Sequence, residues 1–317
     1  MYWLIKYLIR RWHEYQGRRN AGGSAAPQTA GTAAPRTGRR AVPRGVRPSV
    51  QRASAAARGP LALLAHQVRY DLRASLRNPP ARFFTVFFPI VLLVVFAGVF
   101  GHGHTVVDGV RVKLSRFYVP GILAMSIVVA SYASLVISIT TMRQTGVLKR
   151  RRATPVPPAM LIAGQALSTV VDVSVMATLL LVIAKLGYGV GFAPAAIVAI
   201  ACTAAVGTVA FACIAYAVSG LIGSPDAAQP VVQMTMLPLW FISGVFIPNS
   251  NLSSGLRSVA SLFPVEHVAA GMHRASVNAS FTGAISPKDL LALAAWAVAA
   301  AGFAAWRFSW LPSTAAA

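Results

Sequence analysis

The chain has 317 residues, of which 56% are hydrophobic and only 11% are charged. A soluble globular domain carries about 25% charged residues, so this composition excludes an ordinary soluble protein and indicates several membrane spans. The net charge is +22, but 12 of the 29 Lys and Arg residues precede residue 60. That basic segment lacks the ordered motif and interleaved aromatic residues of a nucleic-acid-binding domain.

The N-terminal residues read as a tail followed by a surface helix. Residues 1–59 begin with an apolar run too short to span a bilayer and continue in Ala, Gly, Pro, Ser, Thr and Arg. Such a segment buries too little apolar surface to fold, so we predict a disordered basic cytoplasmic tail. Residues 60–82 carry an apolar stripe beside a basic one, ahead of Asn78-Pro79-Pro80. This pattern predicts an amphipathic interfacial helix that leads into the first span.

The rest of the chain predicts an all-α polytopic membrane protein with six transmembrane helices, in a domain of residues 83–307. A short C-terminal tail, 308–317, would follow. Each apolar run is close to the ~20 residues that a bilayer crossing needs. The predicted spans are residues 83–101, 118–141, 160–185, 194–221, 228–247 and 289–307.

The segment between the fifth and sixth spans, residues 248–287, is too long for a tight turn and not apolar enough to cross. Helical spacing of Leu252, Leu256, Val259 and Phe263 predicts an amphipathic helix on the outer leaflet or dipping into it as a re-entrant segment. With both termini inside, this segment lies on the outer side of the membrane.

A basic loop, residues 143–155, separates the second and third predicted spans. It holds five basic residues and no acidic one, so the positive-inside rule predicts a cytoplasmic position. Gly146 and Pro155 suit a rigid turn that is presented to a cytosolic partner. The charges would alternatively serve only to touch anionic lipid, at roughly 1 kcal/mol each.

The order of residues in two places resembles one known family. Arg-x-x-Gly-x-Leu-Lys-Arg-x-Arg-Ala-Thr-Pro at 143–155 resembles the coupling loop of ABC type-2 transporter permeases. Phe-Ile-Ser-Gly-Val-Phe-Ile-Pro at 241–248, followed by Ser-Leu-Phe-Pro at 261–264, resembles their fifth span and outer re-entrant hairpin. The resemblance implies an ATPase-coupling loop of Arg143, Gly146, Leu148, Lys149, Arg150, Arg151, Arg152, Thr154 and Pro155. It implies an outer re-entrant segment that includes Gly244, Pro248, Pro264, Glu266 and His267.

The resemblance, closest to the drug-resistance branch, implies the membrane subunit of an ATP-driven exporter of a hydrophobic or amphipathic drug, antibiotic or lipid-like compound. It implies a second permease copy, in a homo- or heterodimer, a cytosolic ABC ATPase subunit, contact with membrane lipid and no nucleic acid. The expected location is the plasma membrane of a bacterium, as a multi-pass protein with both termini cytoplasmic. The chain has no G-x-x-x-x-G-K-[ST] motif, so ATP and Mg²⁺ would be bound by the partner. An ion-coupled secondary transporter and a polytopic membrane enzyme are the alternatives.

Few residues suggest chemistry of their own. Asp172 is the one acidic residue deep in a predicted span, where a carboxylate costs about 2.5–3.5 kcal/mol. We expect it either to fix helix contacts with nearby Ser and Thr or to lie on the transport pathway, and proton coupling is a third alternative. Glu266 and His267 are expected to tie a loop, and His102-x-His104 to belong to a solvated turn. No catalytic residue, metal ligand or cofactor of this chain is predicted.

Overall fold

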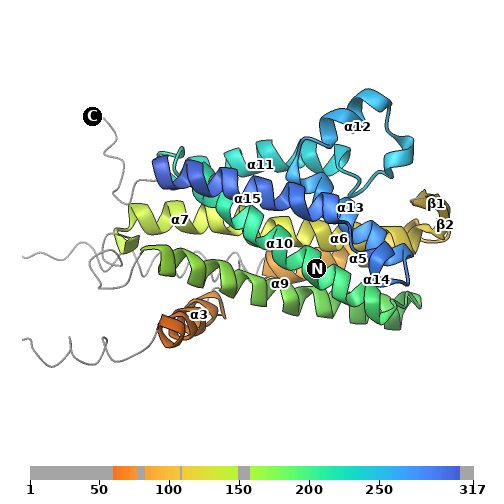
Figure 1. Cartoon of the computed structure of the whole chain (residues 1–317), viewed down its shortest axis with the longest axis horizontal. Coiled ribbons are helices and arrows are strands. Elements are labelled where there is room, and N and C mark those ends of the chain that lie inside the picture. The colour runs from red at the N-terminus through yellow and green to blue at the C-terminus, as the bar shows by residue number, and fades with distance from the viewer. Residues whose placement is uncertain (1–59, 77–82, 108, 149–157, 308–317) are drawn as a thin grey trace, which may run out of the picture. The chain divides into compact units, whose positions relative to one another are not determined.

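The computed structural model describes residues 60–76, 83–107, 109–148 and 158–307, all within one compact unit, Ser54–Ala317 (Figure 1). The predicted tails, 1–59 and 308–317, lie outside the described residues. Within the unit, helices run side by side, with a β-hairpin and short helices at one end and the end of α7 and start of α9 at the other (Figure 1). The polytopic all-α membrane architecture is confirmed.

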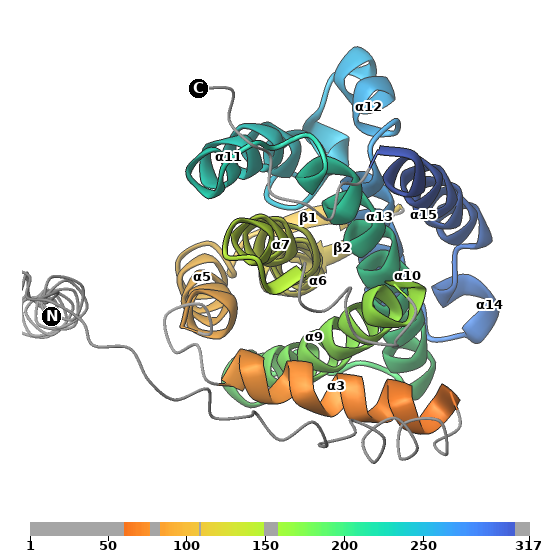
Figure 2. The same cartoon turned by 90° about the vertical axis from the view of Figure 1, so that its left-hand side faces the viewer.

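One long helix forms the centre of the bundle. It comprises α6 (Leu114–Val128), a π-helical turn η2 (Val129–Ala133) and α7 (Ser134–Gln144). Most of its side chains are buried, because α5, α9, α10, α11 and α13 surround it (Figure 2). In the widened turn, the hydroxyls of Ser131 and Ser134 donate to carbonyl oxygens four residues earlier.

The surrounding long helices run along this central helix. They are η1 (Phe83–Phe87) with α5 (Phe88–Val99), α9 (Pro158–Tyr188), α10 (Pro194–Ser219), α11 (Pro225–Ile242) and α15 (Pro287–Arg307). Small residues permit close packing, since Gly207 of α10 lies against Val268 and Gly271 lies against Thr203 of α10.

The predicted number of six spans is not confirmed. Among the described residues, four helices are long and apolar enough to cross a membrane: Leu114–Gln144, Ala163–Tyr188, Pro194–Ser219 and Pro287–Trp306. The first predicted span contains a shorter apolar helix, Thr85–Val99. The fifth is α11, in which Asp226, Gln229 and Gln233 dilute the apolar residues.

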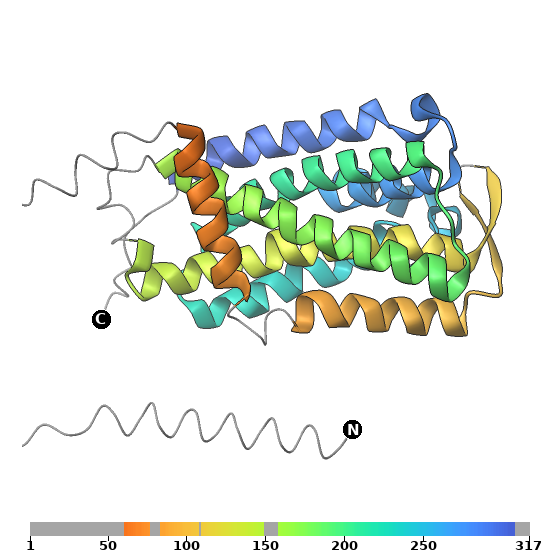
Figure 3. The same ribbon diagram turned by 90° about the horizontal axis from the view of Figure 1, so that it is seen from below.

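The helix α3 (Pro60–Leu76) crosses the direction of the bundle helices and packs on α9 (Figure 3). Gln67 lies against Gly164 of α9, where an added Cβ would come within 2.5 Å of the Gln67 side chain. The amide of Gln67 donates to the buried carboxylate of Asp71 at 2.9 Å. The buried face of α3 therefore includes polar residues, whereas Leu76 of the predicted apolar stripe is exposed. Its place at the membrane surface stays a prediction.

A two-stranded antiparallel hairpin occupies the loop that we predicted as a solvated turn. Strands β1 (His104–Val107) and β2 (Val110–Lys113) pair Val107 with Val110 at the closed end. Gly109 has a φ of 79°, which suits glycine at a tight hairpin turn. Val107 and Val112 are buried, so the hairpin covers that end of the bundle.

The segment between α11 and α15 is helical, as predicted. It contains η3 (Asn249–Asn251), α12 (Ser254–Ala260), α13 (Pro264–Val277) and α14 (Phe281–Ala284). Helix α13 contacts α6, α10 and α15, and buries Val265, Val268 and Met272 against them (Figure 2). Its first turn meets that of α15, since His267 lies 2.9 Å from Asp289.

Candidate functional site

The basic loop begins at an arginine that is almost completely buried. Arg143, in the last turn of α7, is 3% exposed. Its guanidinium donates to the carbonyl oxygen of Ser219 at 2.9 Å and to that of Ile222. These carbonyls lie where α10 ends, and a cation at a helix C-terminus is electrostatically favourable. Arg143 therefore ties the start of the basic loop to α10.

The next residues turn the chain away from the central helix. The N–H of Gly146 donates to the carbonyl oxygen of Arg143 at 3.2 Å, and Gly146 has a φ of +70°. Such a left-handed residue commonly ends a helix, and glycine adopts it at no steric cost. Leu148 is buried, at 5% exposure. Lys149, Arg150, Arg151, Arg152, Thr154 and Pro155 lie outside the described residues.

The opposite end of the central helix packs against the outer segment. Gly121 touches the backbone of Val245, where an added Cβ would lie 2.3 Å from the carbonyl oxygen. Arg116 donates to the carbonyl oxygen of Ser276 at 2.8 Å. One continuous helix therefore connects the basic loop to α13 and to the chain that follows α11.

Gly244 and Pro248 lie at the turn that leaves α11. Gly244 has a φ of 72°, and its carbonyl oxygen accepts a hydrogen bond from Nε2 of His273 at 3.0 Å. The His273 ring stacks on Phe117 with 4.5 Å between centroids. Burial lowers the pKa of His273 to about 4, although the bond to Gly244 opposes the shift. His273 is neutral at pH 7 and packs between the central helix and this turn. The sequence analysis did not single it out.

A cavity of about 340 Å³ lies beside the His273 side chain. Val107, Phe117 and Pro248 line its apolar walls, and Asn249, Arg257 and His273 contribute polar atoms. Within the described residues, the buried Oδ1 of Asn249 and Nδ1 of His273 have no hydrogen-bond partner. The cavity thus combines an apolar surface with hydrogen-bond acceptors and one cationic side chain.

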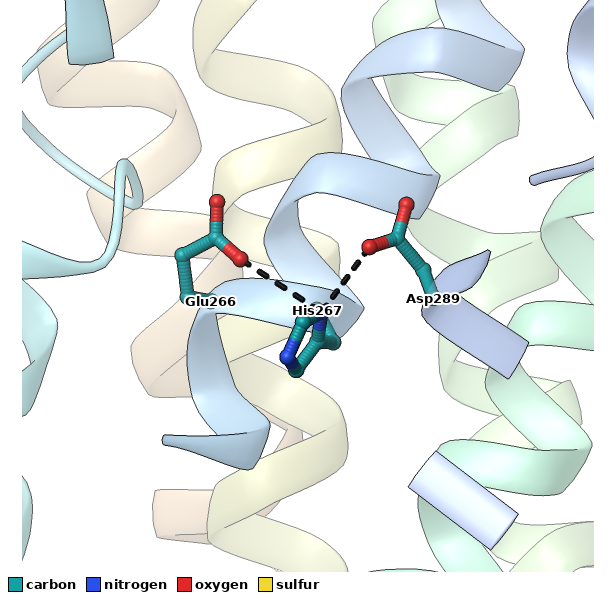
Figure 4. A group of neighbouring side chains, drawn as sticks. All are labelled: Glu266, His267 and Asp289. Carbon is teal, nitrogen blue, oxygen red and sulfur yellow. Dashed lines mark hydrogen bonds and ion pairs between the residues drawn. The ribbon is translucent and has the colours of Figure 1, made fainter. Parts of the chain in front are cut away.

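Glu266 and His267, the residues predicted to tie a loop, begin α13 and meet Asp289 from the first turn of α15 (Figure 4). The His267 Nδ1 is 2.9 Å from Asp289 Oδ1 and 3.6 Å from Glu266 Oε2. The His267 Nε2 is 3.1 Å from the carbonyl oxygen of Ser261, and Asn249 donates to Glu266 Oε1 at 3.4 Å. Glu266 and His267 do connect separate elements of the chain, as predicted. The partner that joins them to α15, Asp289, was not paired with them in the sequence analysis.

Burial and neighbouring charges shift the pKa values of Glu266 and His267. Burial raises the pKa of Glu266, and the neighbouring Asp289 carboxylate adds to the rise. The hydrogen bond to Asp289 raises the pKa of His267 more than burial lowers it, and the charge of Glu266 acts in the same direction. Two carboxylates thus compete for one positive charge.

Asp172 lies on α9, well inside the candidate span Ala163–Tyr188, and is half-buried. The hydroxyls of Ser168 and Thr169 donate to the carbonyl oxygen of Gln165, at 2.8 and 2.9 Å. Ser174 likewise donates to a carbonyl oxygen of its own helix. The hydroxyl protons that we expected near Asp172 are therefore directed to the backbone of α9.

Comparison with known proteins places this architecture. No curated protein matches the chain. The family model described as ABC-2 type transporter matches residues 64–275, more than half of the 317 residues. The matched region includes the central helix, the basic loop and most of α13. This match does not favour a secondary transporter or a membrane enzyme, and the chain belongs to the ABC-2 type transporter family as a membrane permease.

Proposed function

We propose that this permease is the membrane subunit of an ATP-driven exporter of hydrophobic or amphipathic compounds, such as drugs, antibiotics or lipid-like metabolites. Two permease copies, identical or closely related, would pair with two copies of a cytosolic ABC ATPase in a bacterial plasma membrane. The basic loop and both termini face the cytosol in this proposal. ATP-driven closure of the ATPases would switch the permease pair between inward-open and outward-open states.

The observation that carries the proposal is the attachment of the basic loop to the central helix. Arg143 bonds the carbonyl oxygens of Ser219 and Ile222, so the start of the loop is joined to both α7 and α10. A force applied by a partner at residues 149–155 would reach two long helices together. The run Lys149-Arg150-Arg151-Arg152 would offer such a partner four consecutive positive charges.

The central helix would carry this force from the basic loop to the opposite end of the bundle, where it contacts α13. Its far end stacks Phe117 on His273 and bonds Arg116 to the backbone of α13. A displacement at Arg143 therefore acts on the wall of the cavity beside His273. This arrangement supports a mechanism in which closure at the loop opens or closes an exit near α13.

The chemistry of the spans supports an apolar or amphipathic cargo. The candidate span Pro194–Ser219 contains no charged residue, and the cavity near α13 has mainly apolar walls. Asp172, half-buried within the membrane, is the residue that we propose for the pathway, where it would attract a cationic group of the cargo. Amphipathic cations therefore make the first test compounds.

The test uses inside-out vesicles from cells that produce the chain with its ATPase, with ethidium as an amphipathic cationic probe. We expect dye accumulation that requires ATP and persists when ion gradients are collapsed. Changing Arg150, Arg151 and Arg152 to Glu should abolish it. Changing Arg39, Arg40 and Arg44 to Glu is a control of equal charge change in the tail and should not. Accumulation that follows an ion gradient and ignores ATP would refute the proposal.

A further inference from the structure

The Glu266–His267–Asp289 cluster has the composition and geometry of a metal site. One donor atom from each residue lies within 4.8 Å of the other two. Figure 4 shows the Glu266 and Asp289 carboxylates approaching the His267 ring from either side. Two elements supply the donors, α13 and α15, so a bound ion would bridge them. Carboxylate oxygen and imidazole nitrogen are donors that Zn²⁺ accepts.

The tautomer of His267 leaves the correct nitrogen for this role. Its Nε2 lies 3.1 Å from the carbonyl oxygen of Ser261, which can only accept, so Nε2 carries a hydrogen. The Nδ1 atom is then the one directed at both carboxylates. Its 2.9 Å contact with Asp289 Oδ1 is a hydrogen bond when Nδ1 carries a proton, and a metal ion would take the place of that proton. A metal-bound histidine typically donates its other N–H to a carbonyl in this way.

The two distances measured from His267 Nδ1 suit a shared ion. Tetrahedral Zn²⁺, with ligands at about 2.1 Å, separates neighbouring donor atoms by about 3.4 Å. The observed separations from His267 Nδ1 are 2.9 Å to Asp289 and 3.6 Å to Glu266, on either side of that value. The second oxygen of Glu266 accepts from Asn249, which holds the carboxylate in place.

Charge and burial make a divalent ion a suitable occupant. The side chains of Glu266, His267 and Asp289 are 14%, 9% and 10% exposed. Two carboxylates this close and this dry repel each other unless positive charge is placed between them. One proton on His267 would compensate one carboxylate, whereas a divalent ion would compensate both.

We propose that Glu266, His267 and Asp289 bind one Zn²⁺ ion that clamps the start of α13 to the start of α15. The ion would fix the outer segment against the last candidate span. This replaces the expectation that the chain has no metal ligand, and it holds whether or not the permease exports the cargo proposed above.

The test measures metal binding by the purified full-length chain in detergent after removal of metal with EDTA. Zn²⁺ is titrated against a chromophoric chelator, and Co²⁺ is added separately to record the visible absorption of a four-coordinate site. We expect one Zn²⁺ per chain, a Co²⁺ spectrum and a higher unfolding temperature with Zn²⁺ than with EDTA. Mg²⁺ should not compete, because it prefers six oxygen ligands.

His267→Gln and Asp289→Asn should each weaken Zn²⁺ binding roughly 10-fold or more. The matched control is the double variant His102→Gln and His104→Gln, which removes two exposed histidines of the hairpin region and should retain the site. Glu266→Gln provides a third ligand variant if either of the first two fails to fold. An unfolding temperature indifferent to Zn²⁺ and EDTA would overturn the proposal and indicate a protonated His267. Binding that is lost only in the His102/His104 variant would overturn it as well.

Discussion

The guanidinium of Arg143 donates a hydrogen bond to the carbonyl oxygen of Ser219, 76 residues later in the chain, at 2.9 Å. The same group also bonds Ile222, so one buried cation joins the end of the central helix to the end of α10. In the mechanism proposed above, this contact would pass the movement of a bound partner to both helices. It also gives the first prediction.

Replacing Arg143 by Met should destabilise the permease by roughly 2–3 kcal/mol, because the carbonyl oxygens at the end of α10 lose a charged donor. Arg143→Lys should be intermediate, since an ammonium group is a point donor and cannot span both carbonyls as the guanidinium does. Thermal unfolding in detergent measures both effects. A Met variant as stable as the wild type would show that the buried contact contributes nothing.

Gly121→Ala should destabilise the bundle by about 1–3 kcal/mol, because the added Cβ would lie 2.3 Å from the backbone oxygen of Val245. Gly302→Ala is the matched control, since nothing lies within 4 Å of a Cβ there. In a helix that change should be neutral or stabilise by up to about 1 kcal/mol. Equal unfolding temperatures for the two variants would contradict the close contact between α6 and the turn after α11.

The free energy of unfolding should fall as the pH drops from about 6.5 towards 4, because His273 is buried in its neutral form. The folded pKa of His273 is lowered to about 4, so the unfolded chain binds a proton in this range while the folded chain does not. The stabilisation is complete above the unfolded pKa and is lost as pH falls, by roughly 3 kcal/mol at 1.36 kcal/mol per pKa unit.

His273→Gln retains a donor for Gly244 but cannot titrate, so it should flatten this part of the stability profile. The comparison is made by thermal unfolding of both proteins between pH 7 and pH 4. The same loss of stability in wild type and variant would assign the pH dependence to other groups.

Asp172→Asn should lower ATP-dependent ethidium accumulation while leaving the unfolding temperature nearly unchanged, if the carboxylate attracts cationic cargo. Asn keeps the size of the side chain, removes the charge and replaces one acceptor oxygen with an NH₂ donor. Accumulation of an uncharged amphipathic dye is the control and should change less. Loss of stability without a specific effect on the cationic dye would favour a structural role for Asp172.

The long helices could be predicted from sequence because their apolar runs have the length of a bilayer crossing. Residues 118–141, 160–185 and 194–221 coincide with candidate spans for this reason. The hairpin was missed although Asp108-Gly109, a dipeptide typical of hairpin turns, lies between two short valine-rich stretches. Strands of only four residues give a weak hydrophobic pattern, which is easily overlooked between long helical segments.

The side-chain contacts of the site could not be predicted because they join distant segments. Arg143 was read as part of an exposed loop, and nothing in the local sequence indicates that its partners lie 76 and 79 residues away. The pairing of His267 with Asp289 depends on where α13 and α15 begin relative to each other. Only the fold supplies that relation, since each residue alone looks like an ordinary loop or helix-start residue.

The central claim is that residues 143–155 dock an ATPase, and one measurement addresses it directly. The tagged chain is purified from its native membrane in mild detergent, and the proteins that accompany it are identified by mass spectrometry. We predict a co-purifying P-loop ATPase that is lost when Arg150, Arg151 and Arg152 are changed to Glu and retained when Arg39, Arg40 and Arg44 are changed. Reproducible absence of an ATPase from folded, abundant chain, or its retention by the loop variant, would contradict the account.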